Sequence, residues 1–210
     1  MKIDGVIFDC DGTLVDSEGL AVEIVLELLV EAGVRLSAAE LMRRFHGRRF
    51  ATVVDELCQA FPVLDAQALT AHFRARTPVV FRQRLKAMPG ALALVSGLEI
   101  EKCVASNGPV SKIETCLAVT GLLPHFEGRI VSAFEVEAWK PDPRLIEVAA
   151  QRMGVAIDRC LLVEDSLPGV QAGLTAGARV VAYRMSDLQL GALAGHVTRV
   201  DTLSEIRALF

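Results

Sequence analysis

Short apolar runs alternate with stretches of helical periodicity along most of the chain. Residues 3–8 end in an apolar run short enough for a buried strand, and turn residues at 9–13 follow it directly. After residue 90 the alternation recurs and predicts four further strands, at 103–105, 130–132, 161–163 and 180–183. Strands that alternate with helices are typical of βαβ units, so we expect an α/β fold with a parallel sheet.

The block between residues 17 and 87 has a different pattern. Apolar residues there recur at helical spacing, as at Val22, Leu26 and Leu29, and no convincing strand is present. We therefore expect about four helices, inserted between the first strand and the later ones. The expected organisation is an α/β catalytic core with an all-α cap domain, with the boundaries 1–16 and 88–210 for the core and 17–87 for the cap.

One later helix has both of its ends marked. Asp142 followed by Pro143 has the pattern of an N-cap residue and a proline at the first helical position. Gly154 predicts the end of the same helix, because glycine commonly follows the last helical turn. A helix through Met153 is therefore expected after the third strand.

Composition and charge narrow the class of protein. The 210 residues are 52% hydrophobic and 23% charged, which excludes a disordered chain. With 22 Lys and Arg against 26 Asp and Glu, the net charge is -4, so we expect no nucleic-acid partner. Charged residues interrupt every apolar run before it reaches the length of a membrane span or a signal peptide. The five cysteines include no CxxC pair, which fits a reducing compartment. We expect a cytoplasmic protein without a membrane segment, either a monomer or a weak dimer.

Polar residues follow the predicted strands at the edge where parallel sheets bind ligands. They are Asp9 and Asp11 after the first strand, Ser106 and Asn107 after the second, Lys140 after the third, and Glu164 and Asp165 after the fourth. Asn107 is the only asparagine, and Lys140 is one of five lysines against 17 arginines, so abundance does not explain either. We expect these side chains to form one site.

Carboxylates gathered in this way need a cation among them. Two carboxylates ~4 Å apart repel by about 4 kcal/mol at an effective dielectric constant of 20. An all-oxygen set suits a hard ion, and Mg²⁺ is the natural choice because it keeps water ligands and bridges to phosphate. Ser106, Asn107 and Lys140 supply the donors and the positive charge that a phosphoryl group requires. The chemistry indicated is phosphoryl transfer.

The motifs as a set carry a family resemblance. Residues 8–18, which read FDCDGTLVDSE, together with Ser106, Lys140-Pro141 and Glu164-Asp165-Ser166, resemble the four-motif signature of the haloacid dehalogenase (HAD) superfamily, in the branch with a helical cap after the first motif. The match spans the whole chain. It implies a Rossmann-like core, Asp9 as the nucleophile that forms an aspartyl-phosphate, and Asp11 as the general acid and base.

The resemblance also implies the roles of the other site residues. Ser106 and Lys140 would stabilise the phosphate and the nucleophile. Asp165, Asp9 and the backbone carbonyl of Asp11 would bind Mg²⁺. We expect three further contributions, in which Glu164 completes the metal site and Thr13 and Asn107 contact the phosphate.

The residue two positions after the nucleophile, here Asp11, differs between members of the family that catalyse different reactions. Members that resemble dehalogenases or phosphonate hydrolases lack this acid, whereas Asp11 can protonate a leaving oxygen and then activate water. The resemblance thus implies a Mg²⁺-dependent phosphatase of a small phosphorylated metabolite, such as a sugar phosphate or 6-phosphogluconate. One alternative is a β-phosphoglucomutase, whose histidine after the first motif aligns with Ala21. The other is a non-catalytic binding protein on the same fold, which would have no reason to crowd like charges.

The cap contains a basic segment, 43–49, with four arginines in seven residues. It has the composition of a solvated helix end and loop. Alternatively, the cap lowers this segment over the site, so that Arg48 or Arg49 meets a second anionic group of the substrate. Gly47 would then allow the backbone a close approach. We expect His46 to serve packing or the surface rather than catalysis.

Overall fold

A parallel sheet of six strands organises the residues that the computed structural model describes, which are 2–45, 48–126 and 128–210. The strands lie in the order β3-β2-β1-β4-β5-β6, so the chain winds outward from β1 in both directions. A ligand crevice is expected beyond the carboxyl ends of the central strands, where this order reverses. The bounds are β1 (Gly5–Phe8), β2 (Glu101–Ser106), β3 (Ile130–Ser132), β4 (Cys160–Glu164), β5 (Arg179–Tyr183) and β6 (Thr198–Val200).

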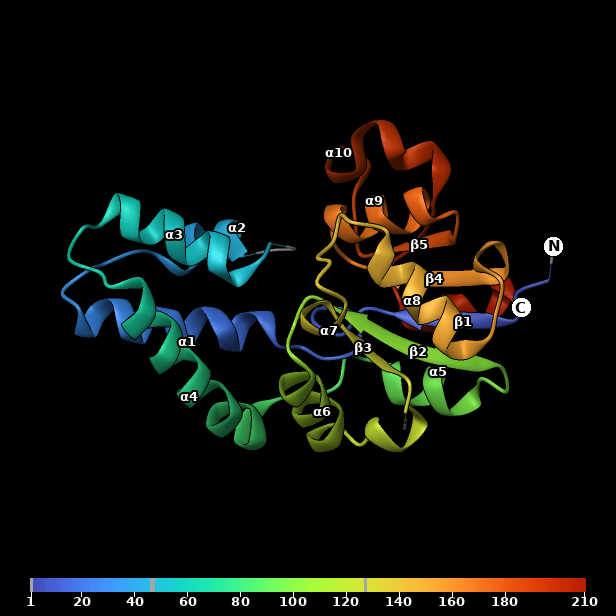
Figure 1. Cartoon of the computed structure of the whole chain (residues 1–210), viewed down its shortest axis with the longest axis horizontal. Helices are drawn as coiled ribbons and strands as arrows, with labels where there is room; N and C mark the ends of the chain where they lie inside the picture. The colour runs from blue at the N-terminus through green and yellow to red at the C-terminus, as the bar shows by residue number, and fades with distance from the viewer. Residues whose placement is uncertain (1, 46–47, 127) are drawn as a thin grey trace.

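Helices cover both faces of the sheet (Figure 1). Alternate residues of β1 point to opposite faces, so Phe8 packs with α5 and α6 while Ile7 packs with α8 and α9. Burial on both faces explains why the central strands consist of continuous apolar runs. The bounds of these helices are α5 (Ala91–Gly97), α6 (Val110–Val119), α8 (Arg144–Met153) and α9 (Leu167–Ala176).

Four helices follow β1 and lie together to one side of the sheet (Figure 1). They are α1 (Glu18–Glu31), α2 (Ala38–Phe45), α3 (Phe50–Ala60) and α4 (Ala66–Arg84). Val22 and Leu29 of α1 are buried and Leu26 packs partly against the same cluster, as the helical spacing predicts. The predicted fold class, an α/β core with an inserted helical cap, is confirmed. In the described part of the chain, no helix combines the length and apolar character needed to cross a bilayer.

Shorter elements complete the core. They are α7 (Ala133–Val136), α10 (Asp187–Leu190) and four 3₁₀ segments, η1 (Leu123–His125), η2 (Ile157–Arg159), η3 (Gly191–His196) and η4 (Leu203–Leu209). Helix α7 connects β3 to the loop that carries Lys140. The chain therefore reaches Lys140 from the carboxyl end of β3.

Two details differ from the sequence prediction. Strand β6 was not predicted, because it has three residues at the sheet edge and only Val200 is buried, which leaves no apolar run to detect. Helix α8 begins at Arg144 with Pro143 in the N-cap position, so Asp142 lies one residue too early to be the N-cap. Its carboxylate still accepts a hydrogen bond from the Arg144 N–H at 3.0 Å. Gly154 ends the helix in the left-handed conformation, with φ 68°, as predicted.

Candidate active site

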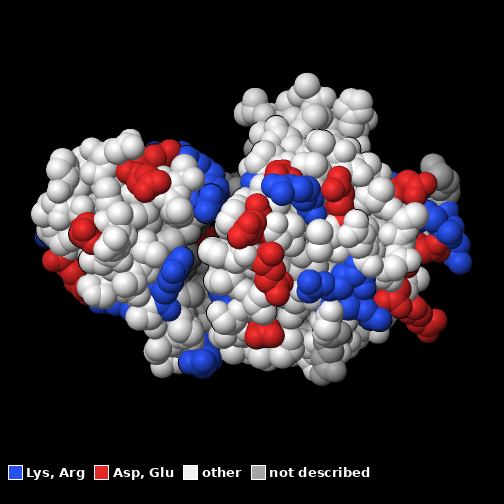
Figure 2. Space-filling model, in the orientation of Figure 1, with Lys and Arg blue, Asp and Glu red and all other residues white. Residues whose placement is uncertain are grey.

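A cavity of about 550 Å³ opens between the helical cap and the carboxyl ends of the central strands. Figure 2 shows the hollow between these two parts, with Lys and Arg side chains on the cap edge that faces it. The core side of the cavity is lined by the polar residues that the sequence places after the strands, namely Asp9, Asp11, Ser106, Asn107, Lys140, Glu164 and Asp165. Loops far apart in the sequence thus converge on one place.

Lys140 holds the carboxylate of Asp9. Its Nζ donates to Asp9 Oδ1 at 2.5 Å and to Glu164 Oε1 at 3.1 Å, and its side chain is only 2% exposed. The backbone N–H of Asp9 donates to the carbonyl of Val163 in β4, which fixes the loop that carries Asp9 to the sheet. Burial alone would lower the pKa of Lys140, but the charges of Asp9 and Glu164 outweigh it and raise the pKa. Lys140 is therefore a fixed positive charge.

Asp9 lies in a surplus of negative charge. Burial raises its pKa to about 7, and the charges of Glu164 and Asp11 add to this effect while Lys140 opposes it. Only the ionised carboxylate is a nucleophile. A further positive charge beside Asp9 would favour the ionised form.

The side chain of Thr13 fixes Asp165 through a hydrogen bond. Its hydroxyl donates to Asp165 Oδ1 at 2.8 Å, and the Thr13 side chain is fully buried and is not part of the cavity wall. Gly12 has φ +80°, and a Cβ at this position would overlap the Asp165 carboxylate. The tight turn of the first motif therefore requires glycine so that Asp165 can approach it.

Asp9, Glu164 and Asp165 form a candidate metal centre. One oxygen from each lies within 4.8 Å of the others. Burial, with the charges of Glu164 and Asp9, raises the pKa of Asp165 well above its ordinary value, although the Thr13 hydrogen bond opposes the shift. Three buried carboxylates with hard oxygen donors, and the one ammonium of Lys140 that pairs with two of them in the described structure, fit a divalent cation such as Mg²⁺.

The oxygens of Glu164 already have protein donors. Oε1 accepts from Lys140, and Oε2 accepts from the N–H and the hydroxyl of Ser166, at 3.0 and 2.8 Å. Gly169 packs directly against this carboxylate, where a side chain would overlap it. Glu164 thus connects Lys140 to the first turn of α9.

A second group with metal-ligand spacing, Cys10, Asp11 and Cys116, has a different character. The contact with Cys116 raises the pKa of Cys10 well above its ordinary value, and burial adds to the shift. The thiol of Cys10 is therefore protonated at neutral pH. Asp11 is paired with Lys112, whose ammonium balances its charge, so this group has no surplus of negative charge to attract a metal ion.

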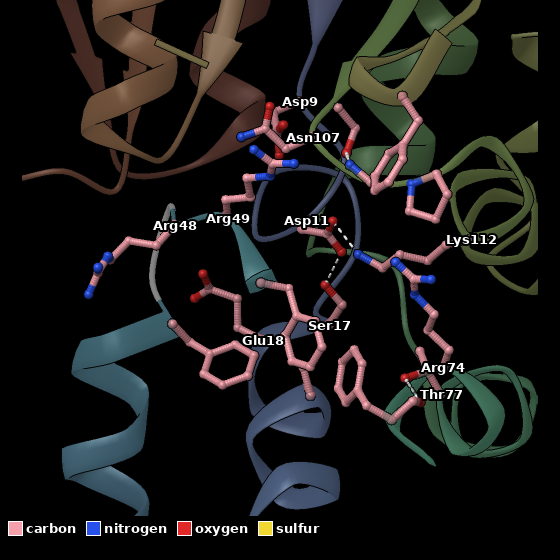
Figure 3. Close-up of a pocket in the computed structure, with 18 of the residues that line it drawn as sticks. Asp9, Asp11, Ser17, Glu18, Arg48, Arg49, Arg74, Thr77, Asn107 and Lys112 are labelled. Carbon is pink, nitrogen blue, oxygen red and sulfur yellow. Dashed lines mark hydrogen bonds and ion pairs between the residues drawn. The ribbon is translucent and has the colours of Figure 1, made fainter. Parts of the chain in front are cut away.

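Asp11 is held by two donors, one on each oxygen. The Ser17 hydroxyl donates to Oδ1 and the Nζ of Lys112 donates to Oδ2, both at 2.5 Å, as Figure 3 shows. Burial alone would raise the pKa of Asp11, but the charge and hydrogen bond of Lys112, with the Ser17 hydrogen bond, lower it. Sequence reasoning missed Lys112. Its signal was the one noted for Lys140, a lysine in a chain of five lysines and 17 arginines.

Ser106 and Asn107 follow β2 and line the cavity. The Ser106 side chain is nearly buried, and its Oγ accepts from the N–H of Gly108 at 3.1 Å, so its hydroxyl proton is available to a ligand. Asn107 Oδ1 accepts from the backbone N–H of Lys140 at 2.9 Å. Asn107 therefore fixes the Lys140 loop through its oxygen and presents its amide NH₂ as a donor.

The two arginines of the basic segment have different surroundings. Arg48 lines the cavity and pairs with Glu56 of α3, with N–O distances of 2.5 and 3.0 Å, and Figure 3 shows it pointing away from Asp9 and Asp11. Arg49 points toward Asp9 and Asn107 (Figure 3), and its guanidinium lies over the ring of Trp139. His46 and Gly47, named as candidates from the sequence, lie outside the described residues.

Aromatic rings form much of the remaining cavity wall. Phe50 and Phe73 stack with centroids 4.1 Å apart on the cap side, and Phe134 meets Trp139 edge to face at 5.5 Å on the core side. Arg74 of α4 also lines the cavity. The ligand space thus combines a charged floor with apolar walls.

Known proteins are similar to this chain in sequence and in fold. Residues 3–177 match the family described as haloacid dehalogenase-like hydrolase. The 6-phosphogluconate phosphatase of Escherichia coli (strain K12) is 33% identical over 210 residues, which cover 100% of this chain and 95% of that protein. The fructose-1-phosphate phosphatase of the same organism is 31% identical over 185 residues, 86% of this chain and 96% of that protein.

A solved structure of a protein from the same family has a similar fold. The crystal structure of a haloacid dehalogenase-like protein of unknown function from Agrobacterium tumefaciens superposes with a TM-score of 0.84 at 29% identity, covering 99% of this chain and 97% of that one. Its fold, the family match over most of the chain and the full-length relative agree with one another. The protein is therefore a member of the haloacid dehalogenase-like hydrolase family.

Proposed function

We propose that the protein is a phosphatase that hydrolyses a small phosphorylated metabolite through an aspartyl-phosphate on Asp9. The observation that carries the proposal is the buried Asp9–Lys140 pair at 2.5 Å, with a second carboxylate, Asp11, two residues along and lining the same cavity. This arrangement supplies a nucleophile held by a fixed positive charge and a separate proton carrier. The phosphatase names of the related proteins support the same activity.

The reaction has two steps. In the first, a carboxylate oxygen of Asp9 bonds to phosphorus, and the bond from phosphorus to the leaving oxygen breaks as Asp11, which takes up a proton when the phosphate anion binds beside it, gives that oxygen the proton. Lys140 and the hydroxyl of Ser106 stabilise the charge on the phosphoryl oxygens. In the second, Asp11 takes a proton from a water molecule that attacks phosphorus, which releases inorganic phosphate and restores both carboxyl groups.

Mg²⁺ is the cofactor that we propose. The side chains of Asp9 and Asp165 and the backbone carbonyl of Asp11 would hold it, with Glu164 beside them orienting Lys140 and Ser166. When bound, the ion would supply positive charge that offsets the charge of Asp9 and of the phosphoryl group. The supporting observation is the closeness of the three buried carboxylates and the raised pKa of Asp9 and Asp165.

For the substrate, we propose a sugar phosphate or a sugar-acid phosphate such as 6-phosphogluconate. The names of the two relatives support this class. Arg49 supports a second anionic group, because it faces the catalytic side chains and has no acidic partner among the described residues. The mutase alternative has less support, since Ala21 lines the cavity without a side chain that can carry a proton.

The proposal is tested by assaying release of inorganic phosphate. The purified protein should release phosphate from an aryl phosphate only with Mg²⁺, and a panel of sugar phosphates and sugar-acid phosphates should identify its preferred class. Isomerisation of a sugar phosphate without phosphate release would instead establish a mutase. No turnover of any monoester with Mg²⁺ present would establish a binding protein.

A further inference from the structure

We propose that Lys112 is a positioning residue that holds the carboxylate of Asp11 in the orientation for proton transfer. The proposal rests on the function proposed above. Lys112 lies in the first turn of α6, which begins just after Ser106 and Asn107. Its side chain lines the cavity and reaches Asp11, 101 residues earlier in the chain.

The first observation behind this proposal is the set of hydrogen bonds to the carboxylate of Asp11. Lys112 Nζ and the Ser17 hydroxyl each contact a different oxygen at 2.5 Å, so the two donors together fix the rotation of the carboxylate (Figure 3). Ser17 is a local neighbour, six residues along the same loop. Lys112 is the tertiary partner that ties this carboxylate to the core. Each carboxylate oxygen has a second lone pair, which leaves Asp11 able to exchange a proton in the cavity.

The second observation is the position of Lys112 in its helix. It is the third residue of α6, where the partial positive charge of the helix N-terminus disfavours a cation. Helix stability therefore does not account for a lysine at this point. Its charge is balanced by Asp11, the only carboxylate with which Lys112 forms an ion pair in the described structure. The pairing thus explains a placement that the helix itself opposes.

The consequence is specific to substrates whose leaving group needs a proton. Without Lys112, the carboxylate of Asp11 rotates more freely and meets the leaving oxygen less often in the right geometry. A displacement of about 1 Å costs roughly 100-fold in rate. An activated leaving group departs without a proton, so its transfer to Asp9 should be unaffected. A lysine that merely bound substrate would affect both kinds of leaving group.

The experiment compares kcat/KM for phenyl phosphate and 2,4-dinitrophenyl phosphate in wild type, Lys112→Met and Lys112→Arg. For Lys112→Met we expect a loss of roughly 10- to 100-fold with phenyl phosphate and less than about two-fold with the dinitrophenyl ester. Lys112→Arg should recover most of the loss, because it restores a cationic donor. Glu114→Ala, at an exposed position of the same helix, should match wild type. Equal losses with both esters, or no loss with either, would overturn the proposal.

A crystal structure of Lys112→Met gives a readout that needs no activity. We expect the Asp11 side chain to occupy more than one conformer or a changed one, with α6 unmoved. An unchanged, single Asp11 conformer would overturn the positioning role. If wild type hydrolyses neither ester, the proposed function fails, and the Asp11 conformation still decides whether Lys112 positions this carboxylate.

Discussion

The guanidinium carbon of Arg49 lies 3.9 Å from the ring centroid of Trp139. Arg49 directly precedes α3 of the cap, and Trp139 is the chain neighbour of Lys140, so this cation–π contact joins the cap to the loop whose lysine holds Asp9. Arg48, one residue earlier, pairs with Glu56 instead. Both arginines therefore border the cavity, but Arg49 points toward Asp9 and Asn107 while Arg48 is held by Glu56.

Arg49→Ala should lower activity on substrates with a second anionic group. Loss of a charge-assisted contact costs about 1.5–3 kcal/mol, which corresponds to a loss in kcat/KM from roughly 10-fold to over 100-fold. A sugar phosphate without a second anion should lose much less, since only the contact with Trp139 disappears. The measurement is kcat/KM for 6-phosphogluconate and for glucose 6-phosphate in the same variant.

Arg48→Ala is the control for this prediction. Its guanidinium is paired at the exposed surface of the cap, where an ion pair contributes about 0–1 kcal/mol, so both substrates should be turned over nearly as in wild type. A larger and substrate-selective loss in Arg48→Ala than in Arg49→Ala would reverse the assignment. Equal losses on both substrates in Arg49→Ala would show that Arg49 only joins the cap to the core and does not contact a second anionic group.

Asp9→Asn and Asp11→Asn should fail at different steps. Asp9→Asn has no nucleophile and should form no covalent adduct with any ester. Asp11→Asn should lose about 10²- to 10⁴-fold with unactivated esters, yet should accumulate phosphorylated Asp9 from 2,4-dinitrophenyl phosphate because the second step lacks its base. Mass spectrometry of the acid-quenched protein distinguishes the two. An adduct on the Asp9→Asn chain would contradict the assignment of the nucleophile.

Removal of Asp165 should weaken Mg²⁺ binding. We expect Asp165→Ala to lower the affinity more than about ten-fold, because a buried carboxylate of the candidate metal centre is lost. Titration calorimetry with Mg²⁺ alone measures this without any substrate. Asp158→Ala removes an exposed carboxylate near the other end of β4 and should leave the affinity unchanged. Wild-type turnover in excess EDTA would contradict the Mg²⁺ requirement itself.

The stability of the metal-free protein should depend on the protonation of Asp9. Its folded pKa is about 7 against an ordinary 3.8, so between these pH values the folded protein keeps a proton that the unfolded chain has lost. The free energy of unfolding therefore decreases as the pH rises from about 4 to about 7. Asn at position 9 does not titrate, so the stability of wild type relative to Asp9→Asn should fall across this window. Denaturant unfolding in EDTA at several pH values tests this, and a constant or rising difference would contradict the shift.

The local part of the site could be predicted because it depends on neighbours in the chain. The alternation of apolar runs placed Asp9, Asp11 and Asp165 after strands, and a parallel sheet brings such positions to one edge. Helical spacing likewise indicated the four cap helices. Edge strand β6 could not be predicted, because three residues with one buried side chain show no hydrophobic periodicity.

The sequence by itself determined the order of the elements, the parallel sheet and the carboxylates that follow its strands, because periodicity and turn chemistry act over a few residues. Only the tertiary structure decided which cations meet those carboxylates. Lys112 reaches Asp11 across 101 residues, and Arg49 rather than Arg48 points toward Asp9, because the packing of α6 and of the cap against the core sets the direction of each side chain. Such pairings depend on how helices pack in space, which the spacing of residues along one helix does not contain.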